Sequence, residues 1–491
     1  MTRSYHSGRF RCLLAIVWVG CAWAGVAHSE DAEPRPTAET NETPPASAAA
    51  GDTDKDLSMS LTHAAPGLIP SLRLHPDYFG SPWQKEGGPL ERSALSGDWG
   101  GARTSLVENG LFLDVSVTQV YQGNLAGGRS TDEGMRYVGS VDYWLSLDTA
   151  KAGLWPGGLL MVHGETRFGR GANLNVGSIV PTNFDGLFPS PAGGPHDTGL
   201  PEVYLMQALS EQLTLVMGKL NAVGLVDQNA FANQSRTQFL NTALNNNPML
   251  FAFAGYAPLA VAAVVTLSPE HSITFAVNDT EGRANGAGWD TAFDRAVTAA
   301  AEWAVKPRLG GQPGTYRLGY LWSDRVMRSY AVDRRTFIGQ LAGLVPPSTE
   351  GENYVVYANF DQYLVTLDEK QGRGWGLFGR FGVAPEDRNA ISQFYSFGVG
   401  GKGIIASRPD DRFGVGWYYA RFSDDLKNNL RVLRRGLRNE QGVEAFYNIQ
   451  VTPAVAVTPT LQVIIDPAAR GPNPASDDYA LVFGVRLQMD F

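Results

Sequence analysis

The chain ends in YALVFGVRLQMDF, residues 479–491, a stretch in which apolar and polar side chains alternate. Successive side chains of a β-strand point to opposite faces, so a strand with this sequence has one apolar and one polar face. The apolar face carries Leu481, Phe483, Val485, Leu487, Met489 and Phe491, and the polar face carries Arg486, Gln488 and Asp490. This pattern predicts a strand that lies between hydrocarbon on one side and a polar interior on the other.

The same period of two recurs from Leu111 onward. In residues 111–118, leucine and valine on one face oppose Asp114, Ser116 and Thr118 on the other. Runs of this kind begin at about sixteen places, near Leu111, Tyr137, Leu159, Glu202, Leu213, Leu259, Ser272, Ala296, Thr315, Tyr354, Trp375, Gln393, Phe413, Val443, Ala454 and Ala480. The sequence therefore predicts an all-β fold, a transmembrane antiparallel β-barrel of about sixteen strands in the outer membrane of a Gram-negative bacterium.

The lengths of the connections give a separate test of this prediction. An even number of strands places both chain ends in the periplasm, with long external loops alternating with short periplasmic turns. The long connections include 169–201, 220–258, 324–353, 423–441 and 466–479, and the short ones include 210–212, 268–270, 368–373 and 452–453. The segment 401–411 is the longest exception among the turns. A secreted β-sandwich or β-helix would also alternate, but it would predict neither this asymmetry nor the terminal Phe, which resembles the recognition end of bacterial outer-membrane barrels.

One stretch, Met249–Pro269, contains no charged side chain and is long enough to suggest a membrane-spanning helix. Gly255 and Pro258 interrupt it, and its second half places β-branched and small apolar residues on one parity. These features favour a loop followed by a strand.

The N-terminus has the features of a secretory signal peptide. Three arginines precede an apolar run from Cys12 to Val26, and Ala27-His28-Ser29 offers a cleavage site, so we assign residues 1–29 to the signal. Cleavage at Ala24 is an alternative, and acylation at Cys21 is a weaker one. Residues 31–58 are rich in Pro, Ala, Thr and acidic residues, whereas residues 59–94 are ambiguous and could be partly ordered. We expect residues 30–94 to form a largely disordered periplasmic linker.

Composition excludes several classes of function. The net charge is −9, so no basic face for nucleic acid is expected. Both cysteines lie in the signal segment, and the histidines are scattered, so we expect no metal site and no cofactor. The run GVGGKG at 398–403 has the spacing of a dinucleotide fingerprint, but it follows a predicted strand and precedes no helix, so we dismiss it.

The segment LSGDWGGAR, residues 95–103, resembles the signature opening of the carbohydrate-selective porins of the OprB family. It predicts a short helix within residues 95–110, with Ser96 or Asp98 as its cap and Gly110 at its end, before a barrel domain of 111–491. Further stretches resemble the same family: GKLN (218–221), DQN (227–229), QFLNTAL (238–244), PDDRFG (409–414), EAFY (444–447) and TPTLQ (458–462) with Asp466-Pro467. Relatives commonly carry Asn-Pro where this chain has Asp466-Pro467.

The resemblance implies a passive channel for carbohydrates and similar small polar solutes, narrowed by inward-folded external loops and facing wall residues. A sugar is neutral and rich in hydroxyl groups, so a selective channel needs paired donors and acceptors and an aromatic surface. Our candidates for the narrowest point are Glu165, Arg167, Arg170, Asp142, Trp144, Asp227 and Arg236. Each could equally belong to a ladder of inward-facing charged side chains, which has only a structural role and keeps the inner wall solvated.

Two rival functions remain at this stage. One is a general or anion-selective porin without a sugar preference, suggested by the inward arginines. The other is an outer-membrane hydrolase, for which only His196 and His271 lie near strand ends. The expected partners are outer-membrane lipid, small-molecule sugars, the barrel-assembly machinery that reads the strand ending at Phe491, and two further copies of the chain in a homotrimer.

Overall fold

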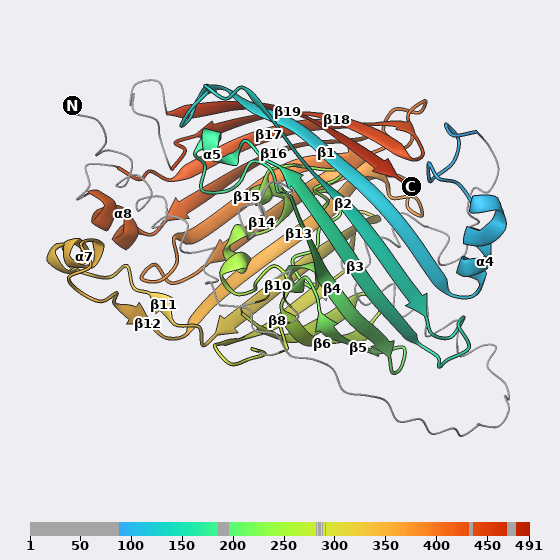
Figure 1. Cartoon of the computed structure of the whole chain (residues 1–491), viewed down its shortest axis with the longest axis horizontal. Coiled ribbons are helices and arrows are strands. Elements are labelled where there is room, and N and C mark those ends of the chain that lie inside the picture. The colour runs from blue at the N-terminus through green and yellow to red at the C-terminus, as the bar shows by residue number, and fades with distance from the viewer. Residues whose placement is uncertain are drawn as a thin grey trace, which may run out of the picture.

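The computed structural model describes residues 88–184, 196–280, 282, 286, 288–289, 291–431, 436–468 and 478–491. Sixteen long strands in this part of the chain form one closed antiparallel wall (Figure 1). The wall strands are β1 (Leu111–Gly127), β2 (Met135–Asp148), β3 (Gly158–Gly169), β4 (His196–Ala208), β5 (Leu213–Lys219), β6 (Leu259–Ser268), β7 (His271–Asp279), β8 (Val297–Val305), β10 (Gln312–Ser323), β13 (Asn353–Asp368), β14 (Arg373–Val383), β15 (Ile391–Lys402), β16 (Arg412–Phe422), β17 (Glu440–Thr452), β18 (Val455–Ile465) and β19 (Tyr479–Asp490). The predicted signal peptide and all of the predicted linker up to residue 87 lie outside the described residues.

The final strand closes the barrel. β19 pairs with β18 on one side and with β1 on the other, with Val117 opposite Met489 and Val120 opposite Arg486. The backbone N–H of Phe491 also donates to the carbonyl of Val115 at 2.8 Å. Closure leaves no edge strand with unpaired backbone groups, which is the condition for a sheet to cross a hydrocarbon layer.

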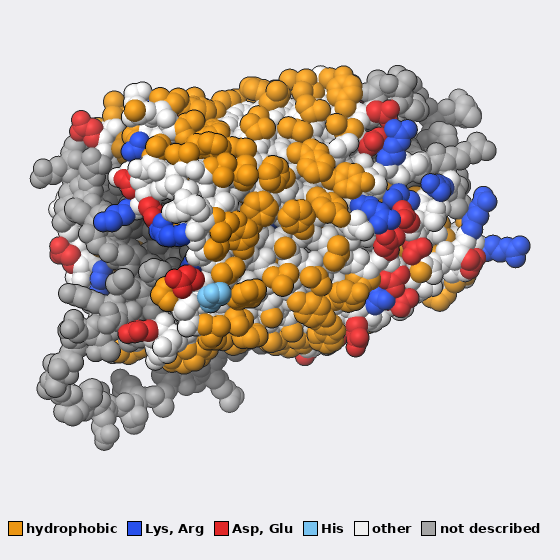
Figure 2. Space-filling model, turned by 180° about the vertical axis from the view of Figure 1, so that it is seen from behind, with side chains coloured by type: hydrophobic (Ala, Val, Ile, Leu, Met, Phe, Trp, Pro, Cys, Tyr) orange, Lys and Arg blue, Asp and Glu red, His pale blue; other side chains and the backbone are white. Residues whose placement is uncertain are grey.

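The two faces of the wall are inverted relative to a water-soluble protein. Outward-facing side chains such as Leu145, Phe397 and Leu461 are exposed, whereas the inward-facing Glu444 and Arg486 are fully buried. Figure 2 shows hydrophobic side chains spread over the middle of the molecule and charged ones gathered toward its two ends. This arrangement confirms the predicted membrane barrel, because a sandwich or β-helix would bury its apolar face.

The predicted strand positions hold with one correction. Fifteen of the strands begin within three residues of the predicted starts, but β4 begins at His196, six residues before Glu202. The predicted loop 169–201 ends at Pro201, and proline is rare inside a central strand. In the structure the ladder between β3 and β4 shifts register between His163 and Glu165, and this irregularity lets the strand continue through Pro201.

The connections alternate as predicted, with two short exceptions at the external end. The periplasmic connections are short, as at 269–270, and none is longer than 403–411. The longest external connection is 220–258. The external connections 128–134 and 384–390 are short. The stretch Met249–Pro269 is a 3₁₀ turn, η4 (Pro248–Ala252), followed by β6, as expected. None of the helices among the described residues has the length and apolar character needed to span a membrane.

Small elements decorate the two ends of the barrel (Figure 1). The external end carries α5 (Asn173–Val176), α7 (Arg334–Leu341), α8 (Asp424–Arg431) and the short hairpin of β11 (Met327–Arg328) and β12 (Thr349–Glu350). The periplasmic end carries η2 (Trp99–Gly101) and α4 (Ala102–Glu108), and the two-residue β9 (Arg308–Leu309) extends the turn before β10.

The helix α4 is fixed to the wall by the arginine of the signature segment. Arg103 is buried, and its Nη2 donates to the Asp114 carboxylate and to the Leu113 carbonyl, each at 2.9 Å. The N-cap of the helix is Gly101, but Asp98 supports the first turn from outside, since its Oδ1 accepts from the Thr104 backbone N–H at 2.8 Å. Gly110 ends it with a φ of 82°. Ser96 contributes no cap and accepts only a long bond of 3.5 Å from Arg103.

The connection 220–258 between β5 and β6 folds into the barrel, and we call it the inner loop. It contains η3 (Ala222–Gly224), α6 (Thr242–Asn245) and η4. Its apolar side chains join the main hydrophobic cluster with inward-facing rings of the wall. The Phe239 ring, for example, lies 5.4 Å from that of Phe378 and 4.8 Å from that of Phe446, centroid to centroid.

Inward-facing glycines of the wall make room for the inner loop. A Cβ added at Gly400 would lie 2.7 Å from the Cβ of Phe231, and one added at Gly416 would lie 2.8 Å from a methyl group of Leu244. These distances are shorter than side chains tolerate, so the loop can approach the wall only where the wall has no side chain. Gly400 belongs to the GVGGKG run, which therefore serves packing in this barrel.

Candidate functional site

The tip of the inner loop reaches the wall at β2 and β19, where Arg236 pairs with Asp142 and the carbonyl of Ser235 accepts from Arg486. Residues 233–237 are partly exposed, in contrast to the buried segments on either side of them. From this tip, Arg236 extends to Asp142 on β2, with 2.5 Å between Nη2 and Oδ1. The tip therefore narrows the interior and touches a polar part of the wall.

The first half of the site is centred on His163 of β3. Its Nε2 lies 2.8 Å from Asp142 and its Nδ1 lies 3.0 Å from Glu202 of β4. Trp144 of β2 stacks on the imidazole with 3.5 Å between the ring centroids and 7° between the planes. All four side chains face inward, because alternate residues of neighbouring strands share a face.

The second half lies beside it, because Asp142 and Glu165 are direct partners across the β2–β3 ladder. Glu165 pairs with Arg167 at 2.8 Å and accepts a hydrogen bond of 2.7 Å from the hydroxyl of Tyr256 in the inner loop. Arg167 donates to the same hydroxyl at 3.1 Å, and its guanidinium carbon lies 5.3 Å from the centre of the Tyr256 ring. The loop is thus held to the wall at two places.

We refer to Asp142, His163, Glu165, Arg167, Glu202, Arg236 and Tyr256 as the charged cluster. Three carboxylates face two guanidinium groups and an imidazole whose two nitrogens both point at carboxylate oxygens. The cations are the more accessible members, since the Arg236 side chain is 23% exposed and that of Arg167 is 11% exposed. The cluster itself therefore carries little net charge, and it can offer paired hydrogen-bond donors to a solute.

The structure brings five of the seven candidate residues to this place. Asp142, Glu165, Arg167 and Arg236 belong to the charged cluster, and Trp144 packs against it. Arg170 lies just beyond the end of β3 and is exposed. Asp227 lies elsewhere in the inner loop.

Three members of the cluster were absent from the candidate set. His163 and Glu202 have the inward parity of their strands, so the alternation contained the signal for both. Tyr256 lies in a segment without charges, and only the folding of the inner loop places it against Glu165 and Arg167. No periodicity in the sequence could have identified that contact.

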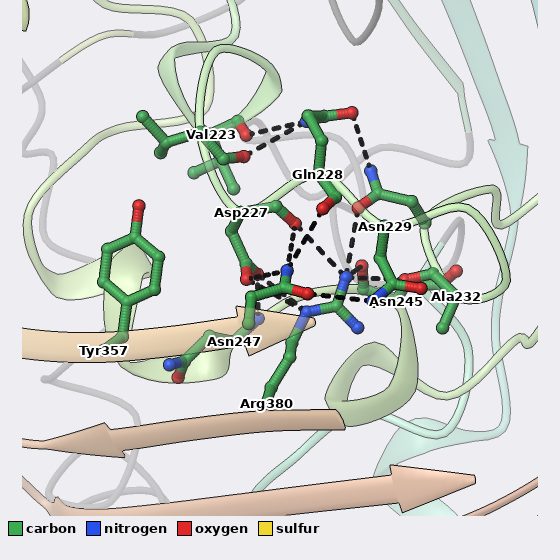
Figure 3. A network of polar contacts seen from close by, with 12 residues as sticks. Val223, Asp227, Gln228, Asn229, Ala232, Asn245, Asn247, Tyr357 and Arg380 are labelled. Carbon is green, nitrogen blue, oxygen red and sulfur yellow. Dashed lines mark hydrogen bonds and ion pairs between the residues drawn. The ribbon is translucent and has the colours of Figure 1, made fainter. Parts of the chain in front are cut away.

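Asp227 pairs with Arg380 of β14, and both side chains are 0% exposed (Figure 3). The guanidinium Nε lies 3.1 and 3.0 Å from the two carboxylate oxygens. Its Nη1 and Nη2 donate to backbone carbonyls of the loop, including those of Ala232 at 2.6 Å and Asn245 at 3.1 Å. The pair therefore fastens the inner loop to the wall from inside.

Other wall side chains hold the loop by its backbone. Glu444 of β17 accepts from the N–H groups of Leu240 and Asn241, both at 2.8 Å. Arg486 of β19 donates to the carbonyl of Gln238 at 3.0 Å. Several of the stretches that resemble the family therefore lie on the two sides of this attachment. DQN and QFLNTAL belong to the inner loop, and EAFY belongs to β17.

The PDDRFG stretch organises the long periplasmic turn 403–411. Although burial opposes it, hydrogen bonds from Arg408, the Gln450 backbone and Tyr447 keep the pKa of Asp411 below its usual value. An ionised Asp411 can then hold the turn against β17. This explains why the longest predicted exception among the turns is nevertheless ordered.

A closed barrel with an apolar belt and a polar interior, narrowed by a loop folded in from the outside, is a transmembrane channel of the porin class. Residues 132–491 match the model of the carbohydrate-selective porins of the OprB family. The chain belongs to this family and is an outer-membrane porin, as the sequence predicted.

Known proteins similar to the chain support the same assignment. Porin B of Pseudomonas aeruginosa is 23% identical over 428 residues, which cover 81% of this chain and 91% of that protein. The putative porin QuiX of Acinetobacter baylyi is 22% identical over 440 residues, covering 82% and 94% respectively. The high-pH structure of Pseudomonas putida OprB superposes with a TM-score of 0.73 at 22% identity, over 83% of this chain and 100% of that one, and confirms the fold.

Proposed function

We propose that the channel lets carbohydrates and similar small polar solutes diffuse passively across the outer membrane, with the charged cluster and the loop tip 233–237 as its narrowest part. The observation that carries this proposal is the balance of the cluster, in which carboxylates and cations are paired with one another. A solute that enters must exchange its hydration water for hydrogen bonds to these groups.

A sugar would meet mainly Arg167, Arg236 and Tyr256. The two guanidinium groups are partly accessible and hold donors in fixed directions toward the hydroxyl groups of the solute. Trp144 is buried and one face of its indole is covered by His163, so it serves to orient the imidazole and offers little surface to a sugar ring. In this proposal Asp227 acts as the anchor of the inner loop and does not line the passage.

Glucose titrated against the single-channel ion current tests the proposal. Sugar bound at the narrowest part should block the current in a saturable manner, whereas a general or anion-selective porin should respond only weakly. A wild-type channel without such block would exclude the sugar preference and leave the general porin.

Replacing Arg167 with Ala should raise the half-blocking glucose concentration about tenfold, since a hydrogen bond from a charged donor contributes about 1.5–3 kcal/mol. Arg170→Ala, which removes an exposed arginine beyond the end of β3, is the matched control and should change the block less than twofold. If the double change Arg167→Ala with Arg170→Ala left sugar block untouched, the assignment of the constriction would be wrong.

We also propose that the chain is a channel without catalytic activity. Of the two histidines near strand ends, His271 stacks on Trp303 with 5.8 Å between the ring centroids, and the side chain of His196 lies outside the described residues. Lipase and protease assays on refolded protein should give background rates only.

Two further partners are proposed, the first from the pattern of the C-terminal strand and the second from the resemblance to porins, among which trimers are common. We expect recognition of the strand ending at Phe491 by the barrel-assembly machinery, and assembly of the barrel as a homotrimer. The mass of the detergent-solubilised protein in native mass spectrometry separates a monomer from a trimer.

A further inference from the structure

Both nitrogens of the His163 imidazole face carboxylate oxygens in the middle of the charged cluster. Nε2 lies 2.8 Å from Oδ1 of Asp142, and Nδ1 lies 3.0 Å from Oε2 of Glu202. A neutral imidazole has one N–H donor and one acceptor nitrogen, and only the protonated ring donates from both nitrogens. In the neutral ring one of the two contacts would be unfavourable, because the lone pair of a nitrogen would face an acceptor oxygen.

The two carboxylates accept hydrogen bonds at all four of their oxygens. Oδ1 of Asp142 also contacts the guanidinium of Arg236, and its Oδ2 accepts from the hydroxyl of Ser140 at 3.1 Å. Oε1 of Glu202 accepts from the backbone N–H of Asn221 at 3.2 Å. Both groups therefore have the surroundings of an ionised carboxylate, and the extra proton belongs on the imidazole.

The charge balance of the cluster leads to the same protonation state. The ionisable groups around the imidazole come from four elements, namely Asp142 on β2, Glu165 and Arg167 on β3, Glu202 and Tyr204 on β4, and Arg236 and Tyr256 on the inner loop. Three carboxylates and two guanidinium groups leave one negative charge without a counterpart, and an imidazolium supplies that counterpart. The indole of Trp144 stacks on the ring, and the electron-rich face of an aromatic ring favours a cation.

The same two carboxylates connect His163 to two parts of the inner loop. Asp142 holds Arg236 at the tip of the loop, and Glu202 holds the backbone of Asn221 near its base. A single imidazole on β3 therefore fixes the directions of the two side chains by which β2 and β4 hold the loop.

We propose that His163 is a positively charged positioning residue of the constriction, which holds Asp142 and Glu202 in place for the inner loop and completes the charge balance of the passage. The inference deepens the proposed function and rests on it for the place of sugar contact, since His163 acts on a sugar through Asp142 and Arg236. Loss of the imidazolium proton at alkaline pH leaves the passage one charge more negative and releases one of the two carboxylates.

Ion selectivity without sugar tests the charge of His163. The ratio of potassium to chloride permeability, obtained from the reversal potential in a potassium chloride gradient, should rise at least twofold in the wild type between neutral and alkaline pH. His163→Gln is neutral at every pH, so it should have the raised ratio at neutral pH already and change less on alkalinisation. Lysines and tyrosines that titrate in the same range are present in both proteins, so the difference between them isolates His163.

Glucose block of the single-channel current tests the positioning role. The half-blocking concentration should rise at least threefold in His163→Gln at neutral pH, and in the wild type at alkaline pH, because Arg236 loses its fixed direction. His163→Arg keeps a positive charge at every pH tested, so it should not show the alkaline rise in the permeability ratio. His271→Gln, at the start of β7 and outside the charged cluster, is the matched control and should behave as the wild type does.

A wild-type permeability ratio that does not change with pH would overturn the proposal, as would a change of the same size in His163→Gln. A wild-type channel that glucose does not block would instead refute the proposed function, and the permeability ratios measured without sugar would still decide the charge of His163. A normal shift in electrophoretic mobility on heating should establish that each variant is folded. The wild-type pH dependence and His163→Arg keep the test decisive if His163→Gln does not fold.

Discussion

Arg380 uses all three guanidinium nitrogens inside the protein, on Asp227 and on carbonyl groups of the inner loop. A buried ion pair is costly to form and still more costly to break on one side, because the remaining charge is left without a partner. The charged cluster differs, since its arginines keep part of their surface accessible. The same residue types therefore serve attachment at one place and, in the function proposed above, solute contact at the other.

Replacing Arg380 with Met should destabilise the barrel by about 3–5 kcal/mol, because Asp227 would remain buried and unpaired. The inner loop should loosen, and the single-channel conductance should rise. Urea unfolding followed by tryptophan fluorescence, together with bilayer recording, measures both effects. The double variant Arg380→Met with Asp227→Asn is the control and should lose less stability; equal losses in the two variants would contradict the role given to the pair.

At the scale of elements, the inner loop and the wall strands β14–β17 fit together as two complementary surfaces. Phe231, Phe239 and Leu244 on the loop meet Gly400 and Gly416 on the wall. The helix α4 is attached in a comparable way at the periplasmic end, through Arg103 and Asp114. In both cases a connecting segment acquires a fixed position from wall residues that are distant in sequence.

Replacing Gly400 with Ala should displace the inner loop, because the new Cβ would lie 2.7 Å from the Cβ of Phe231, an atom close to the backbone. Overpacking of this kind costs about 1–3 kcal/mol. We expect a lower unfolding midpoint in urea and a larger, noisier conductance. Gly351→Ala is the control, since nothing lies within 4 Å of the added atom; an identical result for both variants would show that the wall glycines are not needed for loop packing.

At the scale of the whole molecule, stability comes from an inverted distribution of side chains. The outer surface of the wall is apolar because hydrocarbon surrounds it, and the interior is polar yet closely packed. Closure between β1 and β19 satisfies the backbone groups of both terminal strands. The wall strands therefore position the inward-facing polar side chains, and the inner loop supplies hydrogen-bond partners for them.

A charge placed on the outer surface should reveal the depth of the membrane. Leu461→Arg, at the middle of β18, should cost about 2–4 kcal/mol, while Val451→Arg, near the periplasmic end of β17, should cost about 0–1 kcal/mol. Both side chains are exposed on the outward face, so packing losses are comparable. Unfolding of the protein in lipid vesicles measures the difference, and equal costs would mean that the outward face does not contact hydrocarbon.

Alternation and loop length, which are local properties of the sequence, were sufficient to predict the strands, their inward faces and the alternation of long and short connections. They placed Asp142, Trp144, Glu165 and Arg167 together because neighbouring strands share parity. Parity alone does not say which inward residues meet the inner loop. For this reason His163 and Glu202 were passed over, although both face the same side.

The sequence by itself determined that the chain is a membrane barrel, because a period of two is imposed residue by residue wherever lipid lies on one face of a strand and a polar interior on the other. Only the tertiary structure decided which wall residues the inner loop contacts. The partner of Asp227 lies 153 residues away in the chain, and Tyr256 meets Glu165 across 91 residues. Contacts of this kind depend on how a long loop folds back into a closed wall, and no local pattern encodes that path.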